Sequence, residues 1–259
     1  MIARNISRWA LGEIATLALV GVLAAWLFEF HPIDMQVAQA FYDPRVGYGW
    51  PWASVGWVRF VNDHLITIVT IVGAVASVLL WIFGSRVDKS WRFAGMFLFL
   101  SLLVGPGLLV NEVLKAEWGR AVPRDVVNFG GSHAYRHISN PGASGPPERG
   151  GEGGSFPSGH ASVAFWTSGF YFLLRRKRPR AALAALSGTL AFGALVAFAR
   201  MAAGRHFISD VVWSGIIVLA VNWLLYQAML RRWPEAAARE VPREAPKQAL
   251  GAATPADAG

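Results

Sequence analysis

Long apolar runs separated by short polar segments dominate this chain. Most of the runs are close to the roughly 20 residues that cross a bilayer as a helix. They cover Leu11–Phe30, Leu65–Phe83, Phe93–Val110, Ala161–Leu174, Ala181–Ala199 and Val211–Leu230. The fourth run is short, but a helix that begins near Gly159 gains the missing turn. The pattern predicts an all-α fold, an integral membrane bundle of six transmembrane helices within residues 1–233.

Composition supports a chain that contacts lipid. Of its 259 residues, 54% are hydrophobic and only 15% are charged, and 12 are Trp. Cysteine is absent, which excludes disulfides, thiol catalysis and a thiolate metal site. After Pro234 the sequence is rich in Ala, Pro and Glu without apolar periodicity. We therefore predict that residues 234–259 form a disordered tail on the cytoplasmic side.

Positive charge is unevenly distributed between the loops. The formal charge of +8 would suggest nucleic acid in a soluble protein, but here the basic residues gather between apolar runs, so we expect no nucleic-acid partner. Those on one side of the six-span arrangement are Arg4, Arg8, Arg86, Lys89, Arg92, Arg175, Arg176, Lys177, Arg178, Arg180, Arg231 and Arg232. Because cytoplasmic loops carry the excess of Lys and Arg, both termini are predicted to be cytoplasmic.

The opposite side holds two long loops, residues 31–64 and 111–159. Trp50, Trp52 and Trp57 in the first loop suggest a stretch at the headgroup level that does not cross the bilayer. The second is rich in Gly, Pro and Ser between Gly130 and Gly154, which predicts a mobile or irregular lid.

Polar residues that could bind a ligand or take part in catalysis gather on the side of these loops. They are Lys115 after the third helix, Ser158, Gly159 and His160 at the start of the fourth, Arg200 at the end of the fifth, and His206 and Asp210 at the start of the sixth. The first turn of a helix has unsatisfied N–H groups and a positive dipole, so the fourth helix predicts a phosphate site. Gly159 permits close approach of an oxyanion. Ser158 either caps this helix or donates its hydroxyl to the ligand.

His206 and Asp210 are four residues apart at a helix start, so both side chains point the same way. The carboxylate can then accept from one imidazole nitrogen and leave the other unprotonated and nucleophilic. A His/Asp pair at this spacing is often only structural. Here the nearby cations Lys115, Arg200 and Arg205 favour a site that binds phosphate and stabilises transition-state charge.

Three sequence blocks resemble the signatures of the type 2 phosphatidic acid phosphatase superfamily. Pro157-Ser158-Gly159-His160 is intact, and Ala199-Arg200 is followed by five residues, His206, three residues and Asp210. The Lys-x6-Arg-Pro block departs from the family pattern, because Val122 stands between Lys115 and Pro123 where the arginine belongs. Either Arg120 or Arg124 supplies the missing charge, or the site binds phosphate more weakly.

The resemblance implies a set of roles for the site residues. His206 would be the nucleophile that forms a phosphohistidine, Asp210 its orienting partner, and His160 the acid that protonates the leaving alcohol. The phosphoryl oxygens would be held by Lys115, Ser158, Gly159 and Arg200, with Arg120 or Arg124 as the further cation. The resemblance implies no metal ion and no cofactor.

A site at the headgroup level predicts a phosphorylated membrane lipid as substrate, at the periplasmic face of a bacterial inner membrane. The candidates are lipid A 1-phosphate, undecaprenyl diphosphate, phosphatidylglycerophosphate and phosphatidic acid. Residues 118–131 are similar to the corresponding stretch of lipid A 1-phosphatases, which favours the first. The competing class is a non-catalytic lipid-binding or transport protein that lost turnover through Val122. The intact His160, His206 and Asp210 favour the enzyme. The oligomeric state stays open.

Overall fold

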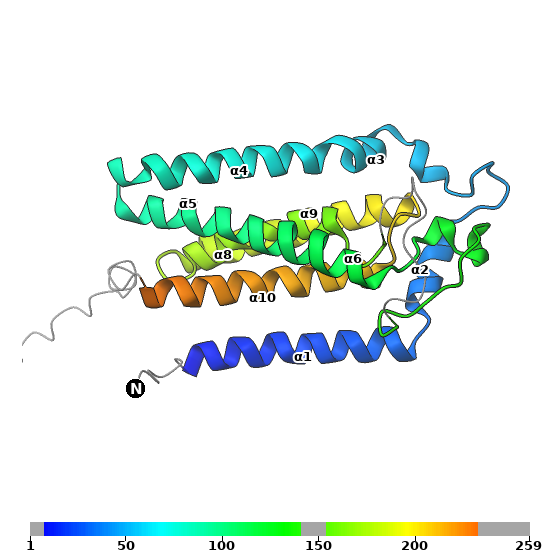
Figure 1. The fold of residues 1–259 in the computed structure, drawn as a ribbon, viewed down its shortest axis with the longest axis horizontal. Coiled ribbons are helices and arrows are strands. Elements are labelled where there is room, and N and C mark those ends of the chain that lie inside the picture. Colours follow the sequence, from blue (N-terminus) through cyan, green and yellow to red (C-terminus); the bar gives the residue numbers. More distant parts are fainter. Residues whose placement is uncertain (1–7, 141–153, 233–259) are drawn as a thin grey trace, which may run out of the picture.

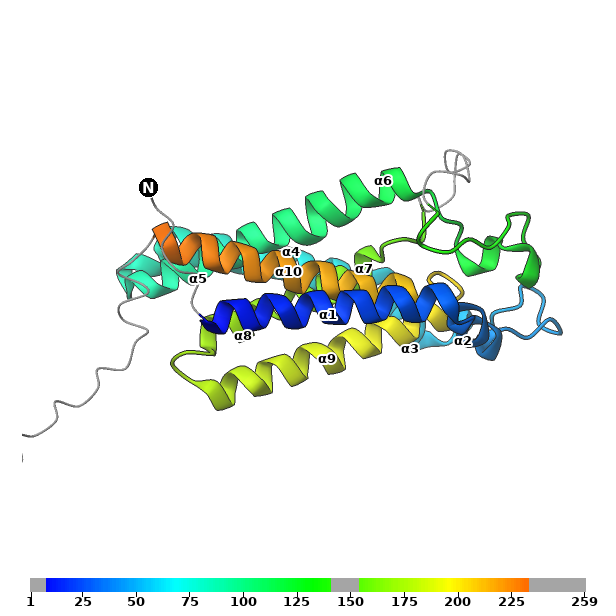
Figure 2. The same cartoon turned by 90° about the horizontal axis from the view of Figure 1, so that it is seen from below.

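The computed structural model describes residues 8–140 and 154–232. Within these ranges every regular element is a helix and no β-strand is present, so the all-α prediction is confirmed for the described residues. The long helices are α1 (Arg8–Phe30), α4 (Ile66–Phe83), α5 (Lys89–Leu102), α9 (Pro179–Ala202) and α10 (Ile208–Arg232), and they run side by side in an elongated bundle (Figures 1 and 2). The tail 234–259 and residues 141–153 of the Gly-rich loop lie outside the described residues.

The shorter helices connect the long ones or extend them. They are α2 (Ile33–Phe41), η1 (Pro51–Ser54), α3 (Gly56–Phe60), η2 (Val61–Leu65), η3 (Gly84–Arg86), η4 (Leu103–Leu114), α6 (Lys115–Trp118), η5 (Pro123–Asp125), η6 (Val127–Phe129), α7 (Gly159–Trp166) and α8 (Gly169–Leu174). Two of them, η2 and η4, are π-helical and continue into or out of α4 and α5. Wider turns of this kind often occur at functional sites.

Among the described residues, five helical stretches are long and apolar enough to cross a membrane. They are Ala10–Phe30, Gly56–Arg86, Lys89–Asp125, Pro179–Ala202 and Ile208–Leu230. α1 and α4 expose many of their apolar side chains, with Val22 65% and Val72 60% exposed. Apolar faces of this extent fit contact with lipid better than contact with water. The chain is a multi-pass membrane protein.

The fourth of the six predicted spans differs from the others. It consists of α7 and α8, which are interrupted at Thr167 and Ser168, so it does not join the five long stretches. Asn222 of α10 lies at this break, where its Nδ2 donates to Ser168 Oγ at 2.8 Å and to the Trp166 carbonyl at 3.4 Å. A broken helix inside a bilayer needs such a partner for its freed main-chain groups. The count of six spans stays a prediction.

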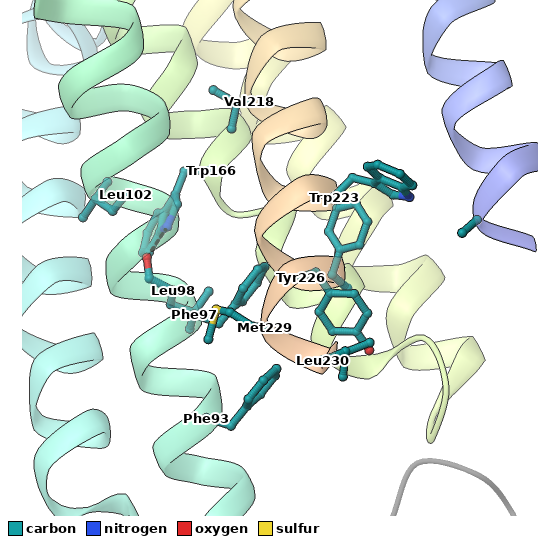
Figure 3. Packing of buried hydrophobic residues seen from close by; sticks show 12 residues of the cluster. Phe93, Phe97, Leu98, Leu102, Trp166, Val218, Trp223, Tyr226, Met229 and Leu230 are labelled. Atoms are coloured by element: carbon teal, nitrogen blue, oxygen red, sulfur yellow. Dashed lines mark hydrogen bonds between the residues drawn. The ribbon is translucent and has the colours of Figure 1, made fainter. Parts of the chain in front are cut away.

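A packed core joins α5 to α10. Figure 3 shows Phe93, Phe97 and Leu98 on one side and Tyr226 and Met229 on the other, all of them buried. On its other face α5 packs closely on α4, because Gly95 has no side chain: a Cβ there would lie 2.3 Å from the main-chain nitrogen of Trp81. Small residues allow such backbone approach in membrane helix pairs.

The two ends of the bundle differ in charge. At one end lie the start of α1, the end of α10 and the α4–α5 and α8–α9 connections (Figure 1). These connections contain Arg86, Arg175, Arg176, Lys177 and Arg178, as the distribution of basic residues in the sequence predicts. Which side of a membrane this end faces stays a prediction.

The opposite end, which we call the site end, carries α2, α3 and the turn between α9 and α10 (Figures 1 and 2). An aromatic layer covers it: Trp50, Tyr42 and Phe129 pack edge to face, with ring centroids 5.2 to 5.6 Å apart. Trp50 is only 2% exposed, whereas Trp52 and Trp57 are 38% and 43% exposed. Trp50 thus packs inside the protein, whereas Trp52 and Trp57 are partly exposed, and their contact with headgroups stays a prediction.

Candidate active site

The turn from α9 to α10 brings Arg200 and His206 together. Gly204 has φ +66°, which a residue without a side chain adopts most easily. Arg205 N–H donates to the Arg200 carbonyl at 3.0 Å and Gly204 N–H to the Met201 carbonyl at 2.9 Å, the pair of bonds that closes a helix in a Schellman motif. The reversed chain returns His206 to Arg200, whose Nη2 lies 3.2 Å from His206 Nε2.

The imidazole of His206 is buried and fixed in one tautomer. Its Nδ1 lies 2.7 Å from the carbonyl oxygen of Ser155, which can only accept, so Nδ1 carries the proton and the electron pair of Nε2 accepts from Arg200 Nη2. Burial lowers the pKa of His206 to about 4; Asp210 opposes this shift, and the charges of Arg200 and Lys115 add to it. The imidazole is therefore neutral at pH 7 and has a nucleophilic nitrogen beside a guanidinium.

Asp210 is 0% exposed and is the third residue of α10. Its Oδ2 accepts from the main-chain N–H of Phe207 at 2.7 Å, as an acid at this position does in a capping box. Oδ2 is 3.7 Å from His206 Nδ1. The carboxylate thus acts on the imidazole by charge, while the hydrogen bond expected from the sequence is made by the Ser155 carbonyl.

His160 stands in the first turn of α7. Its Nε2 lies 2.8 Å from the main-chain oxygen of Asn62 and donates to it. Ser158 is the N-cap of α7, and its hydroxyl oxygen accepts from Ala161 N–H at 3.4 Å. Of the two interpretations of Ser158, the capping one is seen here, and donation to a ligand stays a prediction.

The starts of α7 and α10 are joined directly. Ser158 N–H donates to the Asp210 carbonyl at 3.3 Å, and the hydroxyl of Ser214 lies 3.0 Å from the Ser158 carbonyl and 2.7 Å from the Asp210 carbonyl. The helix ends that carry the two predicted catalytic histidines are therefore neighbours at the site end.

Asn62, in the π-helical η2, links both histidine-bearing regions and was missed from the sequence. It is 7% exposed, its Oδ1 accepts from Arg200 Nη1 at 3.2 Å, and its Nδ2 donates to the Ala199 carbonyl at 3.1 Å. One residue thus orients Arg200 through its side chain and His160 through its carbonyl. A polar residue just before the apolar run that begins at Leu65 was the available signal.

A cavity of about 520 Å³ opens beside His160. Its lining includes Asn111, Lys115, Gly159 and His160. The other lining residues are mostly apolar and belong to α4, α5 and η4, among them Ile66, Ile71, Phe99, Leu102, Leu103 and Pro106. Gly159 fits tightly, since a Cβ there would lie 2.4 Å from Asn111 Oδ1. Lys115, Gly159 and His160, predicted to act together, share this cavity.

Arg120 and Arg124, the two candidates for the missing family arginine, lie in different surroundings. Arg120 is 2% exposed, and its guanidinium contacts the carboxylates of Asp34 and Asp210. The side chain of Arg124 is 36% exposed and lies 3.9 Å from that of Asp125. Val122, which occupies the family position, is 5% exposed. Whether either arginine binds phosphate stays a prediction.

Residues 94–234 match the sequence profile of the PAP2 superfamily. The chain belongs to the PAP2 superfamily. The predicted membrane phosphatase of this superfamily is thereby confirmed. The matched residues include most of α5, the α7 and α10 starts and every predicted site residue.

Curated relatives of this PAP2 protein share one name. A lipid A 4'-phosphatase of Francisella tularensis subsp. novicida (strain U112) is 30% identical over 227 residues, which is 83% of this chain and 96% of the relative. A lipid A 4'-phosphatase of Rhizobium leguminosarum is 36% identical over 132 residues, 46% of this chain and 49% of the relative. The similarity of residues 118–131 to lipid A 1-phosphatases thus pointed to a different member of the superfamily from the one these relatives represent.

Among solved structures, the PAP2-type phosphatidylglycerolphosphate phosphatase of Bacillus subtilis matches with 16% identity and a TM-score of 0.47, over 84% of this chain and 96% of that one.

No group of three or more His, Asp or Glu side chains suited to hold a metal ion occurs within residues 8–140 and 154–232.

Proposed function

We propose that this PAP2 protein hydrolyses a phosphomonoester or pyrophosphate on the headgroup of a membrane lipid through a phosphohistidine on His206. The observation that carries the proposal is the pairing of a buried, neutral imidazole with Arg200, whose Nη2 lies 3.2 Å from Nε2. A phosphoryl group bound to that guanidinium lies next to the nucleophilic nitrogen. This arrangement suits covalent catalysis, in which the protein nucleophile takes the phosphoryl group before water does.

The reaction proceeds in two displacements. The electron pair of His206 Nε2 forms a bond to phosphorus while the bond from phosphorus to the leaving oxygen breaks, and protonated His160 gives its proton to that oxygen. Water then attacks phosphorus and gives a proton to His160, the phosphorus–nitrogen bond breaks, and inorganic phosphate leaves. His160 acts as acid in the first displacement and as base in the second, a common pair of roles for a positioned imidazole.

Cations and main-chain N–H groups hold the phosphoryl oxygens in this proposal. Arg200 and Lys115 provide charge, and Ser158 and the Gly159 amide provide donors at the start of α7. Arg124 is the exposed candidate for an additional cation, since Arg120 already contacts two carboxylates. No metal ion enters any step.

The cavity beside His160 supports a lipid substrate. A phosphate bound by Lys115 and His160 would lie at the lining of this cavity, and its apolar residues from α4, α5 and η4 suit an acyl chain. The curated relatives are named lipid A 4'-phosphatases, so we propose the 4'-phosphate of lipid A as the preferred substrate. Lipid A 1-phosphate, undecaprenyl diphosphate, phosphatidylglycerophosphate and phosphatidic acid are the alternatives.

The proposed location is the bacterial inner membrane, with the site end in the periplasm. The basic connections at the other end of the bundle support it, because such residues favour the cytoplasm. Both chain termini are then cytoplasmic. The headgroup of a lipid in the outer leaflet would lie at the depth of the site end.

The test is phosphate release by the purified full-length protein in detergent from each of these lipids, with mass spectrometry to identify which lipid A phosphate is lost. We expect loss of the 4'-phosphate, inhibition by vanadate, and a base-stable phosphoprotein after rapid quenching. His206→Ala should abolish all release, while His64→Ala, an exposed histidine at the same end, should not. Binding of the lipids without release from any of them would favour the non-catalytic class.

A further inference from the structure

A second buried carboxylate, Asp34, lies behind the site and has no place in the sequence motifs. It stands in the first turn of α2 and is 3% exposed. Its Oδ1 accepts from the main-chain N–H of Ser209 at 2.9 Å, and its Oδ2 accepts from Ser209 Oγ at 2.6 Å, Arg120 Nη2 at 2.7 Å and the Tyr135 hydroxyl at 3.1 Å. A buried acid with this many donors is held in one orientation.

We infer that Asp34 and Arg120 are positioning residues that hold the first turn of α10, and with it Asp210 and His206, in the reactive geometry. The inference rests on the proposed function of this site. It also gives Arg120 a different role from the phosphate ligand expected from the sequence.

The guanidinium of Arg120 is engaged on every nitrogen. Nη1 donates to Asp210 Oδ1 at 2.5 Å and to Ser209 Oγ at 2.9 Å, Nη2 donates to Asp34, and Nε donates to the Arg136 carbonyl at 2.9 Å. Its flat face lies 4.4 Å from the centroid of the Phe207 ring. A planar fork suits such bridging between two carboxylates. The side chain of Arg120 is therefore buried and hydrogen-bonded to Asp210.

The second acid facing Arg120 provides hydrogen-bond acceptors at the start of α10. If Asp34 were absent, Arg120 and Asp210 would form a single buried pair, and the helix start would lose an acceptor. Asp34 accepts from Ser209, the second residue of α10, and so caps that helix from another part of the chain, where a negative charge is favourable. Removal of Arg120 leaves two buried carboxylates without a shared cation, and removal of Asp34 leaves the buried donors of Ser209 without an acceptor.

Loss of Asp34 or Arg120 would affect His206 through the main chain at the start of α10. Asp210 binds the main-chain N–H of Phe207, and His206 is the residue before it. A loosened first turn would move His206 Nε2 relative to Arg200. Because reacting groups must be held within a fraction of an ångström, a displacement of about 1 Å can lower a rate about a hundredfold.

The experiment compares Asp34→Asn and Arg120→Gln with Asp43→Asn and Arg45→Gln, an ion pair in the loop after α2 in which Arg45 is 88% exposed. kcat, KM and the inhibition constant of inorganic phosphate are measured on protein that elutes as a folded species. We expect the first two variants to lose at least about tenfold in kcat, with KM and the phosphate constant within about twofold, and the controls to match wild type. Normal kcat, or a phosphate constant that rises with KM at unchanged kcat, would overturn the inference.

A readout without turnover separates this inference from the proposed function. In protein with 15N-labelled histidine, the His206 resonances, assigned by their loss in His206→Ala, should shift in Asp34→Asn and stay in Asp43→Asn. Unmoved resonances would refute a positioning role even if the wild type released phosphate. If wild type releases none, the proposed function fails and the resonances alone decide. If the charge variants do not fold, Ser209→Ala replaces them, since it removes only the hydroxyl that bonds both Asp34 and Arg120. We expect the His206 resonances to shift in this variant too.

Discussion

Asn62 holds Arg200 in place: its Oδ1 accepts from Arg200 Nη1 at 3.2 Å. Asn62→Ala removes this acceptor and the donor to the Ala199 carbonyl, and loss of a buried partner costs about 1–3 kcal/mol. We expect kcat to fall about tenfold or more and KM to rise, since Arg200 both binds the phosphoryl group and faces His206. Steady-state kinetics checks this, with His64→Ala from the same segment as control. Equal kinetics in the two variants would show that Arg200 needs no such anchor.

Asp210→Asn tests whether charge at 3.7 Å from His206 Nδ1 matters when a carbonyl already fixes that nitrogen. The variant keeps the size of the side chain but removes the charge that faces Arg120 and the phosphohistidine. We expect a loss of about a hundredfold or more in kcat, by analogy with orienting carboxylates elsewhere. The rate is measured on folded protein, and a rate near that of wild type would assign Asp210 a structural role only.

The pH dependence of kcat/KM reports the pKa values of the essential groups in the free enzyme. Burial lowers the pKa of His206 to about 4 from its ordinary value of 6.5, so the nucleophile is mostly unprotonated above about pH 5. The acid limb set by His206 should therefore fall near pH 4, and log kcat/KM should not yet decline between pH 6.5 and 5.5. A decline with unit slope in that interval, absent from binding of the lipid, would contradict the buried neutral imidazole.

Gly159→Ala tests the close approach of α7 and η4. Its Cβ would lie 2.4 Å from Asn111 Oδ1, so Asn111 must move and give up its 2.7 Å bond to the Pro106 carbonyl. Overpacking of this kind typically costs about 1–3 kcal/mol. We expect at least about a tenfold loss of kcat/KM and a lower melting temperature. Gly188→Ala, in α9 with nothing within 4 Å, is the matched control and should match wild type.

Val122→Arg restores the arginine of the family signature. Val122 is 5% exposed, so a charged side chain there has to enter a buried space near Arg120, which is unfavourable unless it finds a partner. We expect a lower yield of folded protein and lower phosphate release per folded molecule. A higher release rate than wild type would instead show that the phosphate site lacks a cation.

Much of the site could be predicted because its side chains carry recognisable chemistry. His160, Arg200, His206 and Asp210 stand at the ends of apolar runs on one side of the bundle, and the helix ends that carry them do meet. The spacing of His206 and Asp210 correctly placed both near one helix start. The run lengths predicted the long helices for the same reason, since a bilayer sets a minimum length.

The remaining contacts have no local signal. The Ser155 carbonyl that fixes His206 belongs to the main chain, and any residue type could provide it. Asp34 is separated by 175 residues from its partner Ser209, so neither periodicity nor a short motif could connect them. The partners of Arg120 depend on the same long-range fold. The break between α7 and α8 depends on Asn222, which lies 54 residues after Ser168.

That break has a consequence for how the protein is made. The α7–α8 segment leaves the ribosome before Asn222 of α10, yet it depends on Asn222 for the main-chain carbonyl at its interruption. Stable integration of the α7–α8 segment during synthesis therefore requires α10. We expect nascent chains truncated before Ile208 to keep this segment at the translocon or outside the lipid, and chains extended past α10 to integrate it.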